Sequence, residues 1–393
     1  MRRNVLFIIG TLQSGGVSKS MISLLNTWNC EVYNTSLCIC SKKDGIWEQY
    51  IPDKVKKMYD PIIEHVMGGF RSACWLGRHG HILLMLGVVL RLFLSKISRS
   101  KAALLISKMM PRISSENYDL IVDYGGQQLL YYMVDKLNGN KKITFFHNDY
   151  SKWPYYYEAD QKYYQQVDHI FSISQICVDA LKRYFPDCKD KISVMENITS
   201  PFAVKKLAQE IPGEQGDIDA LKTEGYTILC TVAHFCCRKG SDFSIEAAEI
   251  LHRKKIKFKW LFVGKVLEPD LTDIVKEKRL EEDMWFLGIK SNPYPYMELS
   301  NIYIQPSRYE GKSISLDEAK ILCKPIVVTN FSTVNDQFEN RVNASICEMD
   351  GRDLADKIEE LINDEKLRNS YINYLEEHVS DNSSEVNKLY KFL

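Results

Sequence analysis

Residues 302–318 read Ile-Tyr-Ile-Gln-Pro-Ser-Arg-Tyr-Glu-Gly-Lys-Ser-Ile-Ser-Leu-Asp-Glu. The first three residues form a short apolar run with high β-propensity, and Pro306 with Ser307 marks a turn after it. A helical pattern follows and ends before Pro325. This strand, turn and helix predict one unit of an open α/β sheet, in which ligands bind outside the carboxyl ends of the strands.

The same alternation of apolar runs and helical periodicity extends over the whole chain and restarts after residue 220. We therefore expect an α/β fold with two doubly wound, Rossmann-like domains, residues 1–200 and residues 201–393. The boundary lies in a polar, Gly-containing stretch, and the last helix of the second domain is a candidate to cross back to the first. The predicted strands are Val5–Ile9, Leu120–Val122, Ile143–Phe146, His169–Ile173, Tyr226–Val232, Trp260–Gly264, Met284–Leu287, Ile302–Ile304 and Ile326–Val328.

Composition excludes several classes of function. The 393 residues carry 51 basic and 51 acidic side chains, and this zero net charge argues against a nucleic-acid partner. Residues 1–200 have a net charge of +7 and residues 201–393 one of −7, so the first half is expected to meet an anionic partner. Eleven cysteines without a CxxC pair indicate free thiols and a reducing, cytoplasmic location. The apolar run Val5–Ile9 is too short for a signal peptide.

Residues 65–115 differ from the rest of the chain because they contain eight Lys or Arg and no Asp or Glu. Within them, 82–94 is almost wholly apolar but too short to span a bilayer. Two interpretations fit this segment. It is a basic, apolar helix at an anionic membrane surface, or a buried helix with a solvated basic flank.

Two carboxylates eight residues apart suggest a ligand site. Glu310 follows the strand at 302–304, and Glu318 lies in the opening turns of the next helix. The backbone N–H groups near Ser313, Ile314 and Ser315 are free to bind a diphosphate, while the carboxylates accept hydrogen bonds from hydroxyls. This set suits a nucleotide sugar. A helix start with favourably placed acids would show the same pattern.

Three further groups stand at predicted strand ends. Gly15 and Gly16 follow the first strand and open a helix, which allows a phosphate to approach the backbone. His147 follows the strand at 143–146, and Arg238 with Lys239 follows the strand at 226–232. Two adjacent cations are able to neutralise a diphosphate leaving group. Each group also has an ordinary structural explanation: a tight turn, a core histidine or a solvated turn.

Together these motifs resemble the family-4 retaining glycosyltransferases of the glycosyl transferases group 1 type, with the GT-B fold. The resemblance is carried by the run 300–311, which ends Pro-Ser-Arg-Tyr-Glu-Gly, by Glu318 and by the run 324–329. The variant Glu-Gly-Lys-Ser, with Val334–Gln337, is similar to bacterial enzymes of surface polysaccharide synthesis. The resemblance implies two domains facing each other across a cleft.

The resemblance also implies roles for individual residues. Glu310 would contact hydroxyls of the donor sugar, Glu318 would bind the ribose, and Lys239 would stabilise the leaving diphosphate. His147 would lie beside the reacting centre. The remaining donor-binding positions would be Gly15, Gly16, His234, Arg238, Gly288, Gly311, Ser313, Ile314 and Ser315.

The implied reaction is transfer of a hexosyl or N-acetylhexosaminyl group, with retention, from a nucleoside-diphosphate sugar to a glycan or a polyprenyl-diphosphate-linked acceptor. Neither a cofactor nor a metal is expected, because the one Asp-x-Asp pattern, at 217–219, is interpreted as a solvated loop or helix start. His234 occupies a position where the family has arginine, and Ser313 one where it has glycine; Ser313 is still expected to offer its N–H. The alternatives are a nucleotide-sugar 2-epimerase of the same fold and a catalytically inactive assembly subunit.

Overall fold

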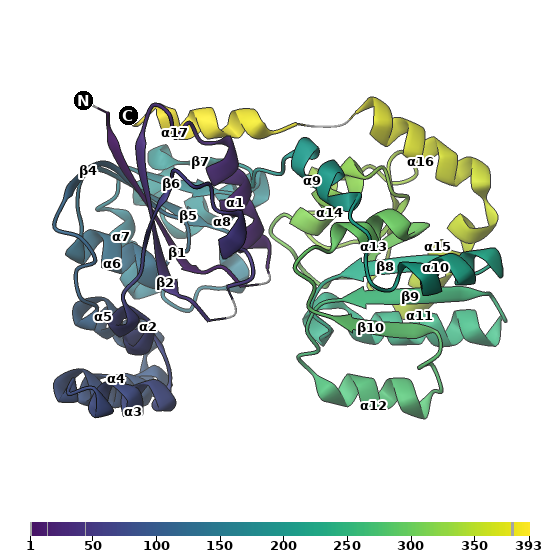
Figure 1. Cartoon of the computed structure of the whole chain (residues 1–393), viewed down its shortest axis with the longest axis horizontal. Coiled ribbons are helices and arrows are strands. Elements are labelled where there is room, and N and C mark those ends of the chain that lie inside the picture. Colours follow the sequence, from purple (N-terminus) through teal and green to yellow (C-terminus); the bar gives the residue numbers. More distant parts are fainter. Residues whose placement is uncertain (1, 14, 44, 379–380) are drawn as a thin grey trace. The chain divides into compact units, whose positions relative to one another are not determined.

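The computed structural model describes residues 2–13, 15–43, 45–378 and 381–393. They form two compact units, and Figure 1 shows that each contains one sheet covered by helices. The first unit comprises Met1–Ile198 and Ser383–Leu393, and the second comprises Thr199–Asn382. The chain thus leaves the first unit close to residue 200 and returns to it after residue 382.

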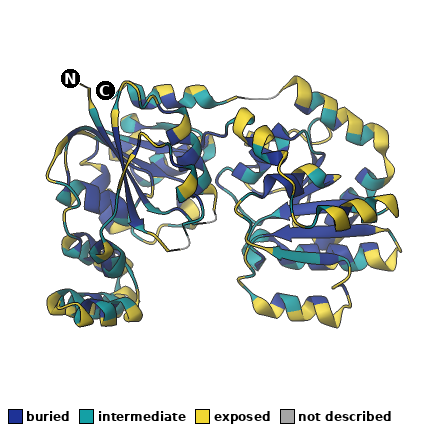
Figure 2. Ribbon diagram, viewed as in Figure 1, coloured by how far each residue is buried: buried dark blue, intermediate teal, exposed yellow. Residues whose placement is uncertain are grey.

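The first unit has a seven-stranded parallel sheet in the order β3-β2-β1-β4-β5-β6-β7. Its strand interiors are buried between helices, as Figure 2 shows, which is why the central strands are continuous apolar runs. The strands are β1 (Asn4–Thr11), β2 (Asn34–Ser41), β3 (Lys56–Met58), β4 (Asn117–Asp123), β5 (Asn138–Phe146), β6 (His169–Ser172) and β7 (Ile192–Val194). The helices before the crossover are α1 (Gly16–Thr27), α2 (Pro61–Met67), α3 (Phe70–Arg78), α4 (Ile82–Ile97), α5 (Arg99–Met109), α6 (Gln128–Lys136), α7 (Tyr157–Tyr164) and α8 (Gln175–Tyr184).

The C-terminal segment completes the core of the first unit. It contains a 3₁₀ turn at Ser383–Val386 and the short helix α17 (Asn387–Tyr390). Leu389 is fully buried, and the ring of Tyr390 lies 4.7 Å from that of Trp28 at the end of α1. The backbone N–H of Asn29 donates to the Tyr390 hydroxyl at 3.0 Å. The first unit is therefore built from two stretches that are distant in sequence.

The second unit has a six-stranded parallel sheet in the order β10-β9-β8-β11-β12-β13. The strand order reverses between β8 and β11, as it reverses between β1 and β4 in the first unit. Such a reversal opens a crevice at the carboxyl ends of the two central strands. The strands are β8 (Thr227–Val232), β9 (Phe258–Val263), β10 (Met284–Gly288), β11 (Ile302–Gln305), β12 (Ile326–Thr329) and β13 (Ser345–Cys347). The helices are α9 (Pro201–Ala208), α10 (Gln215–Thr223), α11 (Ser241–Arg253), α12 (Pro269–Glu277), α13 (Tyr294–Leu299), α14 (Ile314–Ile321), α15 (Gly351–Asn363) and α16 (Glu365–Glu377).

The predicted α/β fold with two doubly wound sheets is confirmed, and each predicted strand coincides with an observed one. Four strands were not predicted: β2, β3, β7 and β13. Three of them, β3, β7 and β13, have only three residues each and lie at the edges of their sheets. β2 begins with the polar residues Asn34, Thr35 and Ser36, so the apolar run after them was not recognised as part of a strand.

The basic segment 65–115 contains the last three residues of α2 and all of α3, α4 and α5. Of the α4 residues only Val88 is buried, so the expected alternative of a buried helix is wrong. None of the described helices has the length and apolar character that a membrane crossing requires.

Candidate active site

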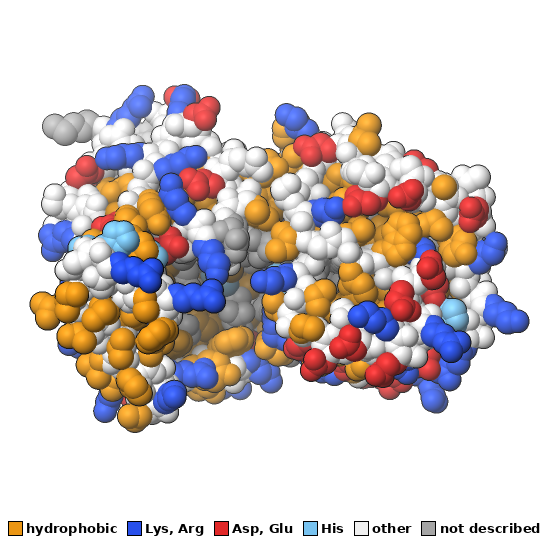
Figure 3. Space-filling model, turned by 60° about the horizontal axis from the view of Figure 1, so that its bottom comes forward, with side chains coloured by type: hydrophobic (Ala, Val, Ile, Leu, Met, Phe, Trp, Pro, Cys, Tyr) orange, Lys and Arg blue, Asp and Glu red, His pale blue; other side chains and the backbone are white. Residues whose placement is uncertain are grey.

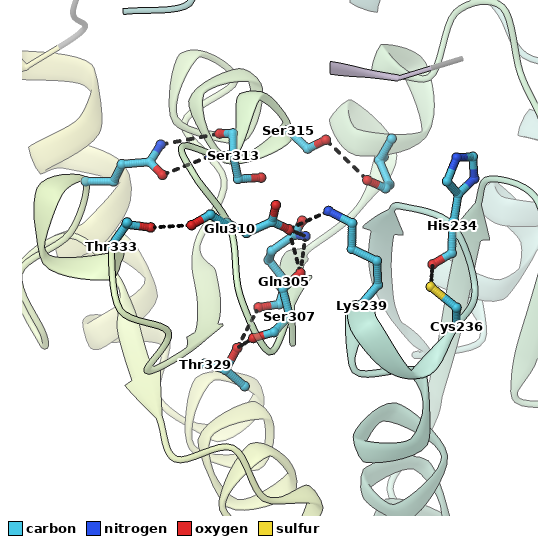
Figure 4. Close-up of polar contacts among 12 residues, drawn as sticks. His234, Cys236, Lys239, Gln305, Ser307, Glu310, Ser313, Ser315, Thr329 and Thr333 are labelled. Carbon is cyan, nitrogen blue, oxygen red and sulfur yellow. Dashed lines mark hydrogen bonds and ion pairs between the residues drawn. The ribbon is translucent and has the colours of Figure 1, made fainter. Parts of the chain in front are cut away.

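The two central strands of the second unit bring together the cation and the carboxylate singled out in the sequence. Lys239 ends the 3₁₀ turn Cys237–Lys239 that follows β8, and Glu310 lies in the loop that follows β11. Lys239 Nζ donates to Glu310 Oε1 at 2.5 Å, and Figure 4 shows the two side chains pointing toward each other. Their side chains are only 16% and 10% exposed. A nearly buried ion pair therefore stands at the strand-order reversal.

A chain of hydrogen bonds fixes the Glu310 carboxylate (Figure 4). Ser307 Oγ donates to Glu310 Oε1 at 2.7 Å, and Gln305 Nε2 donates to the same oxygen at 3.1 Å. The hydroxyl of Tyr303 donates to Gln305 Oε1 at 2.9 Å and so sets the orientation of the amide. The backbone of the loop is fixed as well, because Thr333 Oγ1 donates to the carbonyl of Glu310 at 2.9 Å. Oε1 thus has three donors.

The charge of Glu310 is held by its neighbours. Burial by itself raises the pKa of a carboxyl group, since it penalises the charged form. The ammonium of Lys239, together with Ser307 and Arg238, outweighs this effect and lowers the pKa of Glu310 below its usual value. Glu310 is therefore an ionised hydrogen-bond acceptor at neutral pH.

The turn that carries Lys239 is packed tightly against the loop after β11. Gly240 has φ 70°, and a Cβ atom there would lie 1.8 Å from the carbonyl oxygen of Pro306. Arg308 closes the same contact with a bidentate pair to Asp242, at 2.6 and 2.5 Å. Only glycine permits this approach of the two loops, which is what brings Lys239 within reach of Glu310.

His234 and Arg238 belong to the same turn but differ in charge. Burial, followed by the nearby Lys239, Arg238 and Lys265, lowers the pKa of His234, so that its imidazole is neutral at pH 7. In Figure 4 the His234 ring lies apart from the Lys239–Glu310 pair. The guanidinium of Arg238 lies 5.8 Å from the centroid of the Tyr309 ring. The positive charge of this turn thus resides in Arg238 and Lys239.

The amino end of α14 contains Ser313, Ile314 and Ser315. Among the described residues, the N–H groups of Ile314 and Ser315 have no hydrogen-bond partner, as is usual for a first helical turn. Ser313 departs from the expectation that it offers its N–H, because this group donates to Gln337 Oε1 at 3.2 Å. The Gln337 amide in turn donates to the Ser313 carbonyl and to Asp317 Oδ1, at 3.3 and 3.1 Å. Gln337 therefore holds the loop in place.

Glu318 is fully buried on the inner side of α14. The hydroxyl of Tyr294 donates to Glu318 Oε1 at 2.9 Å.

Gly311 follows Glu310 and is buried, whereas Gly288, at the end of β10, is exposed with φ 70°. The carbonyl of Gly288 accepts a hydrogen bond from Gly264 at 2.9 Å, which ties the end of β10 to that of β9.

In the first unit, the predicted residues follow β1 and β5, the two strands on either side of β4. Gly15 and Gly16 form the N-cap and the first position of α1, after β1, and a Cβ atom at Gly15 would meet no other atom. His147 follows β5, and its Nε2 lies 2.9 Å from the carbonyl oxygen of Tyr124. Because a carbonyl only accepts, Nε2 carries the hydrogen of the neutral ring and Nδ1 carries none. Burial lowers the pKa of His147 to about 4, so the ring is neutral.

A buried carboxylate supports the turn beside His147. Asp123 Oδ1 accepts from the N–H groups of Gly125 and Gly126, both at 3.0 Å, and Oδ2 accepts from Thr144 Oγ1 at 2.7 Å. Burial raises the pKa of Asp123 to about 7 in spite of these donors. The hydrogen bonds fix the turn that presents the Tyr124 carbonyl to His147.

The Asp-x-Asp pattern lies in α10, with Asp217 and Asp219 exposed and Ile218 buried between them. Over the described ranges, no group of three or more His, Cys, Asp or Glu side chains is placed to hold a metal ion.

The structure thus places the predicted residues of each unit at the carboxyl edge of its own sheet. Sequence reasoning missed Gln305, Tyr294 and Thr333 in the second unit and Tyr124 in the first. A polar glutamine at the end of an apolar strand, as at Gln305, is the kind of signal that identifies such a residue. Tyr294 carries no comparable signal, because its partner Glu318 is 24 residues away.

Comparisons with known proteins agree with this geometry. Residues 217–378 match the family described as Glycosyl transferases group 1. A poly(ribitol-phosphate) alpha-N-acetylglucosaminyltransferase from Staphylococcus aureus is 27% identical over 158 residues, which are 39% of this chain and 32% of that protein. An N-acetylgalactosamine-N,N'-diacetylbacillosaminyl-diphospho-undecaprenol 4-alpha-N-acetylgalactosaminyltransferase from Campylobacter jejuni is 27% identical over 124 residues, or 31% of this chain and 34% of that protein. The chain therefore spans about a third of the length of these curated relatives.

Similarity of fold extends further than similarity of sequence. The crystal structure of Alr3699/HepE from Anabaena, in complex with UDP and glucose, matches with a TM-score of 0.71 at 16% sequence identity, and the match covers 99% of both chains. At this identity the likeness concerns the fold. The second unit accordingly matches the glycosyl transferases group 1 family over residues 217–378, and the chain as a whole has the GT-B fold.

Proposed function

We propose that the chain is a retaining glycosyltransferase that moves a hexosyl or N-acetylhexosaminyl group from a nucleoside-diphosphate sugar. The observation that carries this proposal is the buried pair Lys239–Glu310 at the strand-order reversal of a group 1 domain. It combines a cation for a leaving diphosphate with an ionised acceptor for sugar hydroxyls. The same fold is seen in a relative that binds UDP and glucose.

In the proposed complex, the distal phosphate of the donor binds the N–H groups of Ile314 and Ser315. The amino end of α14 adds the positive end of the helix dipole, and Lys239 supplies a full charge. Glu318 binds the ribose, and Gly288 marks the loop that contacts the base. Gly15, Gly16 and His147 of the first unit are further donor-binding residues in this proposal.

The proposed chemistry relies on electrostatic stabilisation. An acceptor hydroxyl attacks the anomeric carbon on the face from which the diphosphate leaves. The bond between the anomeric carbon and the phosphate oxygen breaks, and the leaving phosphate takes the proton of the acceptor hydroxyl. Lys239 and the helix amides stabilise the developing negative charge, so this scheme needs neither a metal nor a protein nucleophile.

The acceptor in this proposal is a glycan or a polyprenyl-diphosphate-linked sugar, bound by the basic first unit. The Campylobacter relative is named for a diphospho-undecaprenol substrate, and the Staphylococcus relative for a ribitol-phosphate polymer. Both names support a role in building a bacterial surface polysaccharide. We place the protein in the cytoplasm, peripherally on the inner face of the plasma membrane.

Neither alternative drawn from the sequence gains support from these comparisons. A 2-epimerase would release free nucleoside diphosphate without transferring sugar, and an inactive subunit would bind the nucleotide without turnover. The histidine at position 234 was the sequence feature in favour of an inactive subunit, but Arg238 and Lys239 keep the turn cationic.

The test is a screen of uridine- and guanosine-diphosphate sugars against a polyprenyl-diphosphate-linked sugar, followed by NMR of the product linkage. We expect transfer with retention, and a loss of turnover of about 10²–10³-fold in Lys239→Ala. Glu310→Ala should also lose turnover, whereas Lys276→Ala on the exposed face of α12 should not. Wild-type rates in both site variants would refute the assignment, and an inverted linkage would refute retention.

A further inference from the structure

The helix α4 presents apolar side chains to solvent on one face. The exposed fractions of Leu83, Leu86, Leu90, Phe93 and Ile97 are 84, 55, 53, 64 and 83%. Their spacing of three and four residues puts them on a single stripe along the helix. We call these five residues the α4 stripe. Figure 3 shows the corresponding concentration of hydrophobic side chains on the first unit, with Lys and Arg around it.

The stripe is exposed although α4 is firmly attached to its neighbours by the opposite face. A Cβ atom at Gly87 would lie 2.3 Å from Met109 Sδ on α5, and one at Gly77 on α3 would lie 2.6 Å from Met85 Sδ. Arg91 turns inward and donates to the carbonyl of Gly68. A surface helix ordinarily turns its polar side chains outward and buries its apolar ones. Here the apolar stripe is outside and the one arginine of the helix is inside.

The segment that carries the stripe has charges of one sign. No Asp or Glu occurs from His65 to Ser115, and seven of the eight basic residues of this segment are exposed. Arg71 stands beside Phe70, which is 68% exposed at the start of α3, and Lys96 lies one turn from Phe93. The exposed basic residues are Arg71, Arg78, Lys96, Arg99, Lys101, Lys108 and Arg112.

This charge distinguishes between the candidate occupants of the surface. An exposed apolar patch of this kind marks a binding surface for a membrane or another protein. A second copy of the chain, related by a two-fold axis, would bring the same cations face to face, which is unfavourable. A layer with an apolar interior and an anionic surface matches both the stripe and its rim. That layer is a lipid leaflet with anionic headgroups.

We propose that the α4 stripe inserts into the headgroup region of an anionic leaflet, while the basic side chains around it bind the lipid phosphates. α4 has 16 residues and a length of about 24 Å, which is shorter than the hydrocarbon core of about 30 Å. It therefore lies in the plane of the leaflet. The proposal rests on the proposed function only for its purpose, which is to bring the enzyme to a lipid-linked acceptor; the binding itself needs no donor or acceptor.

The experiment is flotation of the full chain with vesicles of equal parts phosphatidylglycerol and phosphatidylcholine, and with vesicles of phosphatidylcholine alone. The wild type should float with the anionic vesicles at low salt and much less with the neutral ones. Leu90→Ser combined with Phe93→Ser should lower partitioning about tenfold or more. Arg71→Gln and Lys96→Gln should each lower it about fivefold and reduce its salt dependence.

Matched variants distinguish vesicle binding through the α4 stripe from nonspecific adsorption and from effects on catalysis. Phe202→Ser removes an aromatic side chain of the second unit that is 78% exposed, and it should leave flotation unchanged. Because the altered side chains are exposed, all variants should keep the wild-type circular dichroism and melting temperature. Release of nucleoside diphosphate in detergent, with a short-chain acceptor, should also be unchanged, so loss of flotation and loss of catalysis are measured independently.

Three results would overturn the proposal. The first is a wild-type chain that does not float with anionic vesicles at low salt. The second is flotation that the Leu90→Ser/Phe93→Ser variant retains in full. The third is a dimer in light scattering that the same double variant converts to a monomer, because the stripe would then be covered by a second copy.

Discussion

Lys239 Nζ lies 2.5 Å from Glu310 Oε1, so the candidate phosphate-binding cation and the candidate sugar-binding carboxylate neutralise each other. The pair spans the reversal of strand order and joins two loops 71 residues apart in sequence. In the ion pair, the charges of Lys239 and Glu310 compensate each other. A donor that binds both side chains must compensate these two charges itself. This pairing keeps two opposite charges largely out of water.

Lys239→Ala leaves the Glu310 carboxylate buried without its ion-pair partner. We expect the free energy of unfolding to fall by about 3–5 kcal/mol, as when one partner of a buried pair is removed. Adding Glu310→Gln removes the uncompensated charge, so the double variant should be more stable than Lys239→Ala alone. Urea unfolding of the single and double variants measures this difference. Strictly additive losses would show that the two side chains are not coupled.

Tyr294→Phe removes a buried hydrogen-bond donor to Glu318. The expected loss of unfolding free energy is about 1–3 kcal/mol, together with a higher KM for the donor if Glu318 binds the ribose. Tyr296→Phe on the same helix is the control, since its hydroxyl donates to the half-buried Glu214, and its effect should be smaller. Equal losses in the two variants would mean that the position of Glu318 does not depend on Tyr294.

Gln337→Ala frees the N–H and the carbonyl of Ser313 from the side chain that now binds both. We expect the KM for the donor to rise by about tenfold, because the amino end of α14 is less well positioned for phosphate. The kcat should change less than KM, since Gln337 contacts neither Lys239 nor Glu310 among the described hydrogen bonds. Steady-state rates over a donor titration test this; an unchanged KM would assign Gln337 a purely structural role.

His234→Arg restores a cation at a position where the imidazole is neutral. The pKa of His234 is lowered by burial and by three neighbouring cations, so the wild-type turn has one charge fewer than the arginine variant at pH 7. We expect the arginine variant to bind nucleoside diphosphate about tenfold more tightly, with a steeper dependence on salt. Calorimetric titration with UDP and GDP at two salt concentrations provides the measurement. Weaker binding would indicate that the arginine points away from the phosphates.

Asp123→Asn should change how stability depends on pH. The folded pKa of Asp123 is about 7, above the value of 3.8 for an unperturbed aspartate. The unfolded chain therefore ionises first, and the stability that Asp123 contributes at low pH is lost as the pH rises from about 4 to about 7. The unfolding free energy of the variant, minus that of the wild type, should increase over this window and level off above it. A difference that is constant with pH would contradict the buried, proton-binding state of Asp123.

The gathering of the candidate residues could be predicted from sequence because a parallel sheet brings all its strand ends to one edge. Gly15, His147, Lys239 and Glu310 each lie in the turn or loop after an apolar run, so their location needed only the strands and their direction. The α/β fold followed from the same runs. The short edge strands β7 and β13 were not predicted, because three residues are too few to show a hydrophobic pattern.

Contacts between side chains that are distant in sequence could not be predicted in this way. The capture of the Ser313 N–H by Gln337 depends on how η5 (Val334–Asp336) places the glutamine after it, which no spacing reveals. The exposure of the apolar face of α4 could not be predicted from the sequence either. The composition of 82–94 suits a buried helix and an interfacial one alike. The packing of α4 against its neighbours, including Gly87 against Met109, decides which face is left outside.

The segment Ser383–Leu393 has a consequence for the order in which the chain acquires its structure. The ribosome synthesises all of Thr199–Asn382 before it makes the residues that cover Trp28. The first unit is thus the first to emerge and the last to be completed, while the second is translated without interruption. During this interval the nascent chain exposes the apolar surface that Leu389 and Tyr390 later cover, and this surface is where a chaperone would act on it.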